Sequence, residues 1–342
     1  MLKPFITVLM PVYNCERFIQ QAIESVLNQT YSNFEFLIID DCSTDQTISF
    51  IKKYNDSRIN FIEKPINSGY TISLNLGFKI AKGKYIARMD GDDICVPTRF
   101  EKQVLFLEEN PDVIVCGSLS KILGTNTIMI VPENHEEIKL AMLKANCIIH
   151  PSVMIQKKSI DEFSIVYDTS KEPAEDYDLW VRLAILGSLY NLQEVLLHYR
   201  MYDEQVSNVR NENQKKIAKE CRLKLLNHLP FAKMENEIIV LKKFIEYDVS
   251  IKFTEILLYH EKIKKSILQS NVNGFFEKKG LEDYLSYIEY ETVKAYFLRR
   301  KKYNPSIFFN YLKIRSVVSL NFVFRDEFKL FLKSFNPLGV II

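Results

Sequence analysis

The chain has 342 residues, of which 47% are apolar and 26% are charged, as in a folded protein with one large core and a smaller second domain. Its 45 basic and 43 acidic residues leave a net charge of +2, so the overall charge gives no signal for nucleic acid or for acidic partners. The six cysteines are scattered without a CxxC pair, which argues against a zinc site or a disulfide framework and favours a reducing compartment.

The N-terminal apolar run is too short for a signal peptide. No stretch of the chain reaches the roughly 18 apolar residues of a membrane-spanning helix. We therefore expect a cytoplasmic protein, with any membrane contact peripheral and at the inner face of the cell membrane.

The first ninety residues alternate between strand and helix patterns. Apolar, β-branched runs predict four strands, at 6–10, 34–39, 59–62 and 85–87. Three helices are predicted between them, at 18–27, at 43–51 with a cap among Ser43, Thr44 and Asp45, and at 72–81. This alternation predicts an α/β fold, with a parallel sheet covered by helices on both faces.

Each of these four strands ends in polar or turn-forming residues, at 11–14, 40–41, 67–69 and 90–93. Ligands of open parallel sheets bind at the carboxyl ends of the strands, so we expect the four segments to converge on one crevice. Neither GxGxxG nor GxxxxGK[ST] is present, which argues against the usual dinucleotide and phosphate-loop sites.

Three acids, Asp90, Asp92 and Asp93, follow the fourth strand within four residues. Their charges repel one another, and Mg²⁺ or Mn²⁺ is typically held by one or two carboxylates together with substrate phosphate oxygens. Gly91 lets the backbone turn tightly between the first two acids. The sequence therefore predicts a divalent metal that meets phosphates; a solvated acidic loop is the alternative for the cluster taken alone.

A more mixed pattern follows the acids. Helices are predicted at 99–108 and 135–145, strands at 113–117, 147–155 and 192–199, and a hairpin at 122–131. His150 stands where Pro151 interrupts the 147–155 strand. Glu175 and Asp176 begin an amphipathic helix that ends at Gly187. Such acids complement the helix dipole, but a carboxylate here can also act as a general base.

Four segments together resemble a family 2 glycosyltransferase: PVYN at 11–14, DDCSTD at 40–45, NSGYTISLNLGFKIAKGKYIARMDGDD at 67–93 and AEDYDLWVRL at 174–183. The resemblance extends over roughly residues 5–205. It implies a GT-A fold, a mostly parallel, Rossmann-like sheet flanked by helices. It also implies a nucleotide-sugar donor, a divalent metal (Mn²⁺ or Mg²⁺) and an inverting, single-displacement reaction.

The resemblance also implies roles for single residues. Donor contacts are implied for Pro11, Tyr13, Asn14, Asp41, Asn67, Gly69, Asp90 and Arg200. Among these, Tyr13 would lie beside the uracil ring, Asp41 would bond the base and Asp90 would face the ribose or the donor sugar. Asp92 would hold the metal with Asp93 close by, and Asp176 would be the general base beside Glu175. His150 and Trp180 would contact the acceptor.

The residues by themselves leave other readings open. Tyr13 can be a plain loop aromatic, while Asn67 and Gly69 can serve loop geometry, with Gly69 supplying a positive φ. His150 can be a satisfied structural histidine and Trp180 a packing residue. Asp40 fits a structural cap better than a ligand.

The sequence departs from the family pattern in two places. Leu74 stands where many relatives have Arg, which puts a donor contact at that position in doubt. The QxxRW motif of processive members is absent, so we expect transfer of a single sugar per encounter. The segment HYRMYDEQVSN resembles a lid that closes over the donor, with His198 or Arg200 reaching the diphosphate and Gln205, Val206 and Ser207 following.

Residues 1–210 are thus expected to form the catalytic domain and residues 211–342 a mostly helical domain, with helices at 217–229, 237–247, 253–268 and 281–298.

From Tyr290 onward the net charge is +7, and aromatic residues are frequent. Solvated lysines around an aromatic core, or nucleic acid stacking, would explain this pattern. We favour an anionic membrane surface that presents a lipid-linked acceptor, and we expect no nucleic acid partner.

The sequence therefore favours an inverting glycosyltransferase that builds a bacterial surface glycan, such as a capsule or lipopolysaccharide, from a UDP-sugar. A non-catalytic scaffold that keeps the fold and binds a nucleotide-sugar is the alternative. A nucleic-acid-binding module is a third reading, which rests on the C-terminal charge alone.

Overall fold

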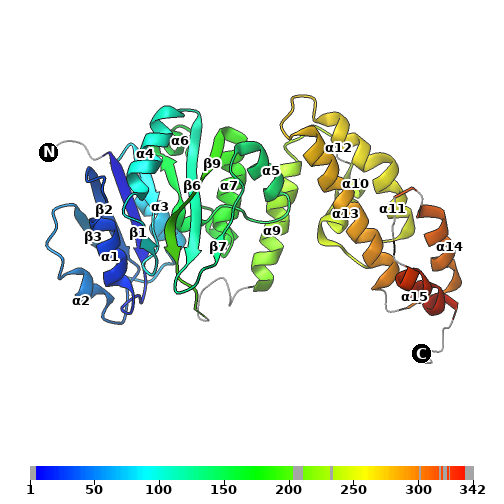
Figure 1. Cartoon of the computed structure of the whole chain (residues 1–342), viewed down its shortest axis with the longest axis horizontal. Helices are drawn as coiled ribbons and strands as arrows, with labels where there is room; N and C mark the ends of the chain where they lie inside the picture. Colours follow the sequence, from blue (N-terminus) through cyan, green and yellow to red (C-terminus); the bar gives the residue numbers. More distant parts are fainter. Residues whose placement is uncertain are drawn as a thin grey trace. The chain divides into compact units, whose positions relative to one another are not determined.

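The computed structural model describes residues 5–202, 211–231, 234–299, 302–315, 317–318, 322 and 324–335. The chain divides into two compact units, Met1–Cys221 and Arg222–Ile342 (Figure 1). This division falls within helix α9 (Asn211–Leu226), whereas the boundary expected from the sequence, at 210/211, precedes that helix.

The first unit is built on a nine-stranded mixed sheet. Its strands are β1 (Ile6–Val12), β2 (Phe34–Asp40), β3 (Ile59–Glu63), β4 (Tyr85–Arg88), β5 (Ile94–Cys95), β6 (Val113–Ile122), β7 (Ile128–Met129), β8 (Met154–Gln156) and β9 (Ser188–Tyr199). Their order is β3-β2-β1-β4-β8-β6-β9-β5, and β7 pairs with β6 outside this path. Strands β1 to β4 are parallel as expected, and β6 is parallel to β9. The other pairings are antiparallel.

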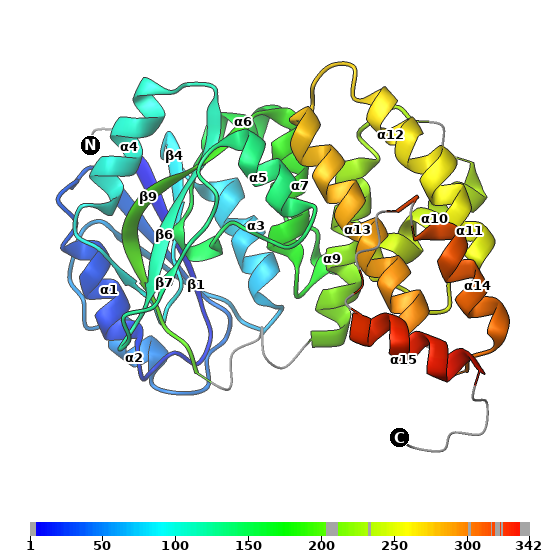
Figure 2. The same ribbon diagram turned by 45° about the vertical axis from the view of Figure 1, so that its right-hand side comes forward.

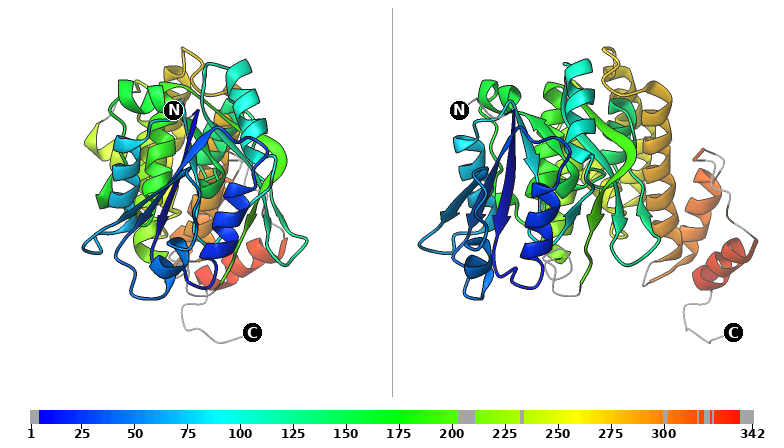
Figure 3. Two further views of the ribbon diagram at one scale, coloured as in Figure 1. Left: turned by 90° about the vertical axis from the view of Figure 1, so that its left-hand side faces the viewer. Right: turned by 60° about the vertical axis from the view of Figure 1, so that its left-hand side comes forward.

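Helices cover both faces of this sheet (Figure 3). They are α1 (Ile19–Leu27), α2 (Thr47–Ile51), α3 (Tyr70–Ile80), α4 (Arg99–Glu109), α5 (His135–Met142), α6 (Lys157–Glu162) and α7 (Glu175–Leu186). On β1, alternate residues such as Val8 share one core with Ile23 of α1 and Phe100 of α4. Leu9 faces the other way onto α3, where a Cβ at Gly77 would lie only 2.2 Å from its Cδ1. The expected α/β fold is therefore confirmed.

Strand β1 continues through Pro11, although we expected this proline to end it. The Leu9 carbonyl accepts a hydrogen bond from the Met89 N–H, and residues two apart on a strand face the same neighbour, so the nitrogen of Pro11 faces the β4 side. Pairing with β4 has already ended at Arg88. The missing N–H of Pro11 therefore costs no ladder hydrogen bond.

Helix α2 begins at Thr47 rather than at 43–45. Asp45 accepts from the Thr47 N–H at 2.9 Å, as a cap would, whereas Ser43 and Thr44 bond the loop after β1. The Ser43 hydroxyl accepts from the Asn14 N–H at 2.9 Å, and the Thr44 N–H donates to Asn14 Oδ1 at 2.8 Å. The expected strand at 147–155 is wrong over most of its length. His150–Ser152 forms a 3₁₀ turn, and only Met154–Gln156 pairs in the sheet.

Arg99 is fully buried on α4, and it links the end of β4 to the segment before β8 by hydrogen bonds. Its Nη2 donates to the carbonyls of Arg88 and Val153, at 2.9 and 3.1 Å. Gln103, one turn later, accepts from Arg99 Nε at 3.0 Å and donates to the Ser152 carbonyl at 2.8 Å. One guanidinium therefore satisfies two buried carbonyls where the acidic segment begins.

The second unit is helical, as expected. Its helices are α10 (Glu235–Glu246), α11 (Phe253–Leu258), α12 (Lys264–Ser270), α13 (Lys278–Leu298), α14 (Pro305–Ile314) and α15 (Phe324–Phe335), with a π-helical turn at Tyr259–Ile263. Phe244 stacks on Tyr259 in its core, with ring centroids 3.7 Å apart. No helix among the described residues is long and apolar enough to cross a membrane. Arg300 and Lys301, which contribute to the C-terminal charge, lie outside the described residues.

We predict that Arg99→Lys lowers the free energy of unfolding by about 2–4 kcal/mol, because the lysine nitrogen is one bond closer to the backbone than Nη2 and lysine has no counterpart of Nε to donate to Gln103. Urea unfolding followed by circular dichroism measures the change. Lys102→Ala on the same helix is the control, since Lys102 makes only a surface ion pair with Glu194 and should stay within about 0.5 kcal/mol of the wild type. Equal stability of the two variants would contradict the role given to Arg99.

Candidate active site

The acids after β4 form one cluster. One carboxylate oxygen from each of Asp90, Asp92 and Asp93 lies within 4.8 Å of the other two. Asp93 is 1% exposed, and its Oδ2 has no hydrogen-bond partner among the described residues. Three hard oxygen ligands, one of them buried and unsatisfied, fit a divalent cation. The structure therefore brings together the residues expected to bind metal, together with Asp90, which we expected at the donor sugar or ribose.

Without a bound cation, the carboxyl groups of Asp92 and Asp93 ionise less readily than free carboxyl groups do. Burial, reinforced by the charge of Asp90, raises the pKa of Asp92 to about 6. Burial and the charges of Asp90 and Asp92 raise the pKa of Asp93 well above its ordinary value. The buried Arg88 at the end of β4 forms an ion pair with Asp90 and offsets part of this repulsion. A bound cation would relieve the remainder.

The chain that leaves β9 is tied to this cluster. Arg200 donates from its backbone N–H to Asp93 Oδ1 at 2.8 Å and from Nε to the Asp92 carbonyl at 2.7 Å. The Tyr202 hydroxyl donates to Asp92 Oδ2 at 2.9 Å. Sequence reasoning missed Tyr202, although it lies in the segment that resembles a lid. Gln205, Val206 and Ser207 of that segment lie outside the described residues.

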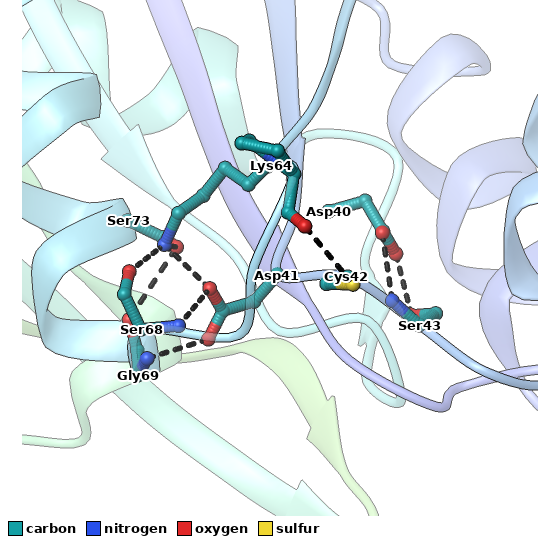
Figure 4. A network of polar contacts seen from close by, with 9 residues as sticks. Asp40, Asp41, Cys42, Ser43, Lys64, Ser68, Gly69 and Ser73 are labelled. Carbon is teal, nitrogen blue, oxygen red and sulfur yellow. Dashed lines mark hydrogen bonds and ion pairs between the residues drawn. The ribbon is translucent and has the colours of Figure 1, made fainter.

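The carboxylate of Asp41 holds the loop that follows β3 (Figure 4). It is 2% exposed and accepts from Lys64 Nζ at 2.5 Å, from the Ser68 N–H at 3.0 Å and from the Gly69 N–H at 2.8 Å. A carboxylate offers about four acceptor positions, so these three contacts leave room for one more donor. The expected bond to a base stays a prediction, and Lys64 is a site residue that sequence reasoning missed.

The remaining donor-side residues differ in their exposure. Tyr13 is 46% exposed and Asn67 is exposed, so both are open to a ligand, whereas Pro11 is buried within β1. Asn14 has a positive φ of 51°, and its side chain bonds Thr44. Asp40 accepts from the N–H and hydroxyl of Ser43, at 2.9 and 2.5 Å, which is a local cap, as the sequence indicated (Figure 4).

The carboxylate pair at the start of α7 has two distinct environments. Glu175 is 4% exposed and accepts from the Tyr70 hydroxyl at 2.8 Å. Asp176 accepts from Asn146 Nδ2 at 2.8 Å and from the Tyr177 N–H at 2.7 Å. Burial and the charge of Asp176 raise the pKa of Glu175 to about 8, while burial raises the pKa of Asp176 to about 6. Asp176 therefore gives up its proton more readily than Glu175 does.

The two residues expected at the acceptor are packed together. His150 Nε2 lies 2.8 Å from the Tyr167 hydroxyl, and the His150 ring meets Trp180 edge-on, with centroids 5.7 Å apart. Burial and the charge of Arg88 lower the pKa of His150 well below its ordinary value, so the imidazole is neutral. Trp180 is fully buried. In this structure both side chains are packed among their neighbours, and acceptor contact stays a prediction.

Contacts between loops join these groups into one site. Asn14 bonds the loop after β2, and Asp41 bonds the loop after β3. Tyr70, next to Gly69, bonds Glu175 across 105 residues of sequence. Arg88 pairs with Asp90 and also lowers the pKa of Asp176, so the acidic cluster and the start of α7 share one electrostatic environment.

Comparison with known proteins identifies the family of the chain. Residues 7–163 match the family model for glycosyl transferase family 2. An uncharacterized glycosyltransferase of Haemophilus influenzae is 34% identical over 307 residues, which are 84% of this chain and 91% of that protein. The Escherichia coli protein WfaP, a UDP-Glc:alpha-D-GlcNAc-diphosphoundecaprenol beta-1,3-glucosyltransferase, is 35% identical over 204 residues, 59% of this chain and 79% of that one.

A solved structure shares the fold. S. aureus TarS, residues 1–349, in complex with UDP-GlcNAc superposes with a TM-score of 0.59 at 17% sequence identity, covering 95% of this chain and 90% of that one. The fold is GT-A. Together, the fold and the matched sequences identify the chain as an enzyme that transfers a sugar from a nucleotide-sugar donor. The chain belongs to glycosyltransferase family 2.

We predict that Gly69→Ala lowers the free energy of unfolding by about 1–3 kcal/mol and also weakens nucleotide binding. Gly69 has φ 97° and ψ 148°, a conformation that L-residues avoid, and its N–H bonds Asp41. Gly124→Ala is the control, because Gly124 also has a positive φ, of 78°, but stands in the β6–β7 turn with open space around it. Thermal melting and nucleotide titration of both variants separate general strain from damage to the site; equal nucleotide affinity in both would contradict the prediction.

Proposed function

We propose that the protein is an inverting glycosyltransferase that moves one sugar from a UDP-sugar to a hydroxyl of a glycan or lipid-linked oligosaccharide in bacterial surface polysaccharide biosynthesis. The observation that carries this proposal is that Arg88 forms an ion pair in an acidic cluster suited to a metal and also acts on the carboxyl group of Asp176, which ionises more readily than its neighbour Glu175. The donor and acceptor named for WfaP support the choice of a UDP-sugar and a lipid-linked acceptor.

The donor side of the site uses the loops at the ends of β1 to β4. Asp92 and Asp93 would hold Mn²⁺ or Mg²⁺, which when bound neutralises charge on the departing nucleoside diphosphate. The exposed Tyr13 offers its ring to the base, and Asp41 retains an acceptor position for a base N–H. Asp90 faces the ribose or the donor sugar, and Arg200 links the segment after β9 to the cluster.

The acceptor side uses the start of α7. Asp176 takes the proton of the acceptor hydroxyl as that oxygen bonds the anomeric carbon, and the bond from this carbon to the diphosphate oxygen breaks on the opposite face. The configuration is therefore inverted. Glu175 keeps its proton at neutral pH and so adds no second negative charge beside the base. His150 and Trp180 support the acceptor wall.

The place in the cell where the reaction would occur follows from the proposed acceptor. A lipid-linked acceptor would be met by a cytoplasmic enzyme that binds peripherally at the inner face of the cell membrane. Transfer of one sugar per encounter is consistent with the absence of the QxxRW motif from the sequence. No specific observation favours the alternative of a non-catalytic scaffold, and none favours a nucleic acid partner.

We predict that UDP binds in calorimetric titration only when Mn²⁺ is present, that GDP binds more weakly, and that chelator abolishes binding. Asp92→Asn should weaken Mn²⁺-dependent UDP binding by at least about tenfold, the scale of losses at metal sites. Asp161→Asn on α6 is the matched control, since Asp161 pairs only with Lys157 on the surface and should leave binding unchanged. Binding that needs neither metal nor Asp92 would refute the site.

We also predict that kcat/KM falls as the pH is lowered through about 6, because Asp176 of the free enzyme then holds a proton and cannot accept another. Asp176→Asn should lower kcat by about 10²–10⁴-fold. Glu175→Gln should keep this acid limb, since Glu175 is protonated throughout it. If Glu175→Gln removed activity and Asp176→Asn did not, the two roles would be reversed.

The same pair makes stability depend on pH. The pKa of Glu175 is higher in the folded chain than the ordinary 4.5, so the folded state binds this proton more tightly than the unfolded chain. Its contribution to the free energy of unfolding therefore falls as the pH rises from about 4.5 to about 8. Thermal melts of Glu175→Gln should show a gain over the wild type at pH above this window and little difference below it.

A further inference from the structure

Helix α15 exposes a row of phenylalanines in the second unit. Phe328, Phe331 and Phe335 are 52%, 42% and 42% exposed, and their spacing puts them on one side of the helix. Leu330 and Ser334 are fully buried and form the side that packs within the unit. The aromatic row is thus distinct from the fully buried side of α15, although Phe331 and Phe335 also contact Phe308 of α14 with part of their rings.

Helix α14 extends this apolar surface, and the two helices lie side by side (Figure 2). The ring of Phe335 contacts Phe308 and Phe309, with centroids 5.8 and 6.2 Å apart. Phe309 and Leu312 of α14 are themselves 55% and 44% exposed. We call the exposed residues Phe309, Leu312, Phe328, Phe331 and Phe335 the aromatic face.

A row of cations flanks the aromatic face. Arg325, Lys329 and Lys333 follow one another at four-residue spacing on α15, and all three are exposed. Of the two acids on α15, Glu327 accepts from the Tyr311 hydroxyl and lies 3.5 Å from Arg315, so its charge is already engaged. Residues 302–335 hold six basic side chains against two acidic ones. The segment that forms the helix pair is therefore net positive.

We propose that the aromatic face inserts at the surface of an anionic lipid bilayer, with Arg325, Lys329 and Lys333 on the lipid headgroups. Phenylalanines on one face beside a basic row form the pattern of helices that lie in the membrane interface. A second copy of the chain would bring two basic rows together, and the charge complementarity favours lipid over self-association. That this membrane binding brings the enzyme to a lipid-linked acceptor rests on the proposed function. Lipid binding itself does not require catalysis.

Co-flotation of the full chain with vesicles tests this surface. Vesicles of phosphatidylcholine mixed with phosphatidylglycerol should carry the protein, phosphatidylcholine alone should not, and added salt should weaken the binding. Lys329→Glu with Lys333→Glu, and separately Phe328→Ser with Phe331→Ser, should each lower the bound fraction about tenfold or more. Matched controls on other exposed positions of this unit, Lys265→Glu with Lys278→Glu and Val249→Ser with Val272→Ser, should float like the wild type.

Several results would overturn the proposal. Equal partition into both kinds of vesicle, or wild-type flotation of the two charge reversals on α15, would exclude an anionic interface. Self-association in solution that the phenylalanine variants abolish would assign the aromatic face to a second copy instead.

Circular dichroism melts identify any variant that fails to fold. If the serine variants unfold, the charge reversals, made at exposed positions, still test the proposal. Transfer to a water-soluble acceptor should be the same in all of these variants, so loss of lipid binding and failure of the catalytic proposal are distinguishable.

Discussion

Arg88 ends β4 with a buried positive charge, and Asp90, two residues later, is its ion-pair partner. The same charge lowers the pKa values of Asp92, Asp93 and Asp176, and so opposes the effect of burial on all three. The pKa values of Asp92 and Asp93 nevertheless stay raised, so the cluster still ionises at a cost that a bound cation would relieve. Arg99 fixes the backbone at this point by donating to the Arg88 carbonyl. The geometry of the whole site therefore depends on where β4 ends.

Around this charge the site separates two tasks. The acids after β4 lie on the donor side, where a metal and phosphates would add compensating charges. On the acceptor side, Tyr70 and Asn146 each engage one carboxylate, while burial and the charge of Asp176 raise the pKa of Glu175 above that of Asp176. Different surroundings thus separate the pKa values of two adjacent carboxyl groups, which is how one pair can hold both a base and a neutral acid.

The second unit illustrates the two uses of aromatic residues that its composition left open. Phe244, Tyr259 and Phe297 are buried in its helical core, as the structural reading of the sequence predicts. Phe328, Phe331 and Phe335 of α15 are not, and a basic row lies beside them. The exposure of each side chain therefore separates aromatic residues that form the core from those that reach the surface, and contact of the latter with a membrane stays a proposal.

The sequence by itself determined the first four strands, the helices between them, the acidic cluster and the carboxylates of α7, because these follow from local periodicity and from residues close together in the chain. The tertiary structure alone decided that β8 and β6 pair antiparallel beside β4, that Tyr70 meets Glu175, and that Tyr202 meets Asp92. It also decided that Lys64 and Arg88 are the counter-charges of the site. The physical reason is distance along the chain: hydrogen bonds that join residues about a hundred positions apart leave no periodic trace in the sequence, and pKa values depend on burial that only the packed fold creates.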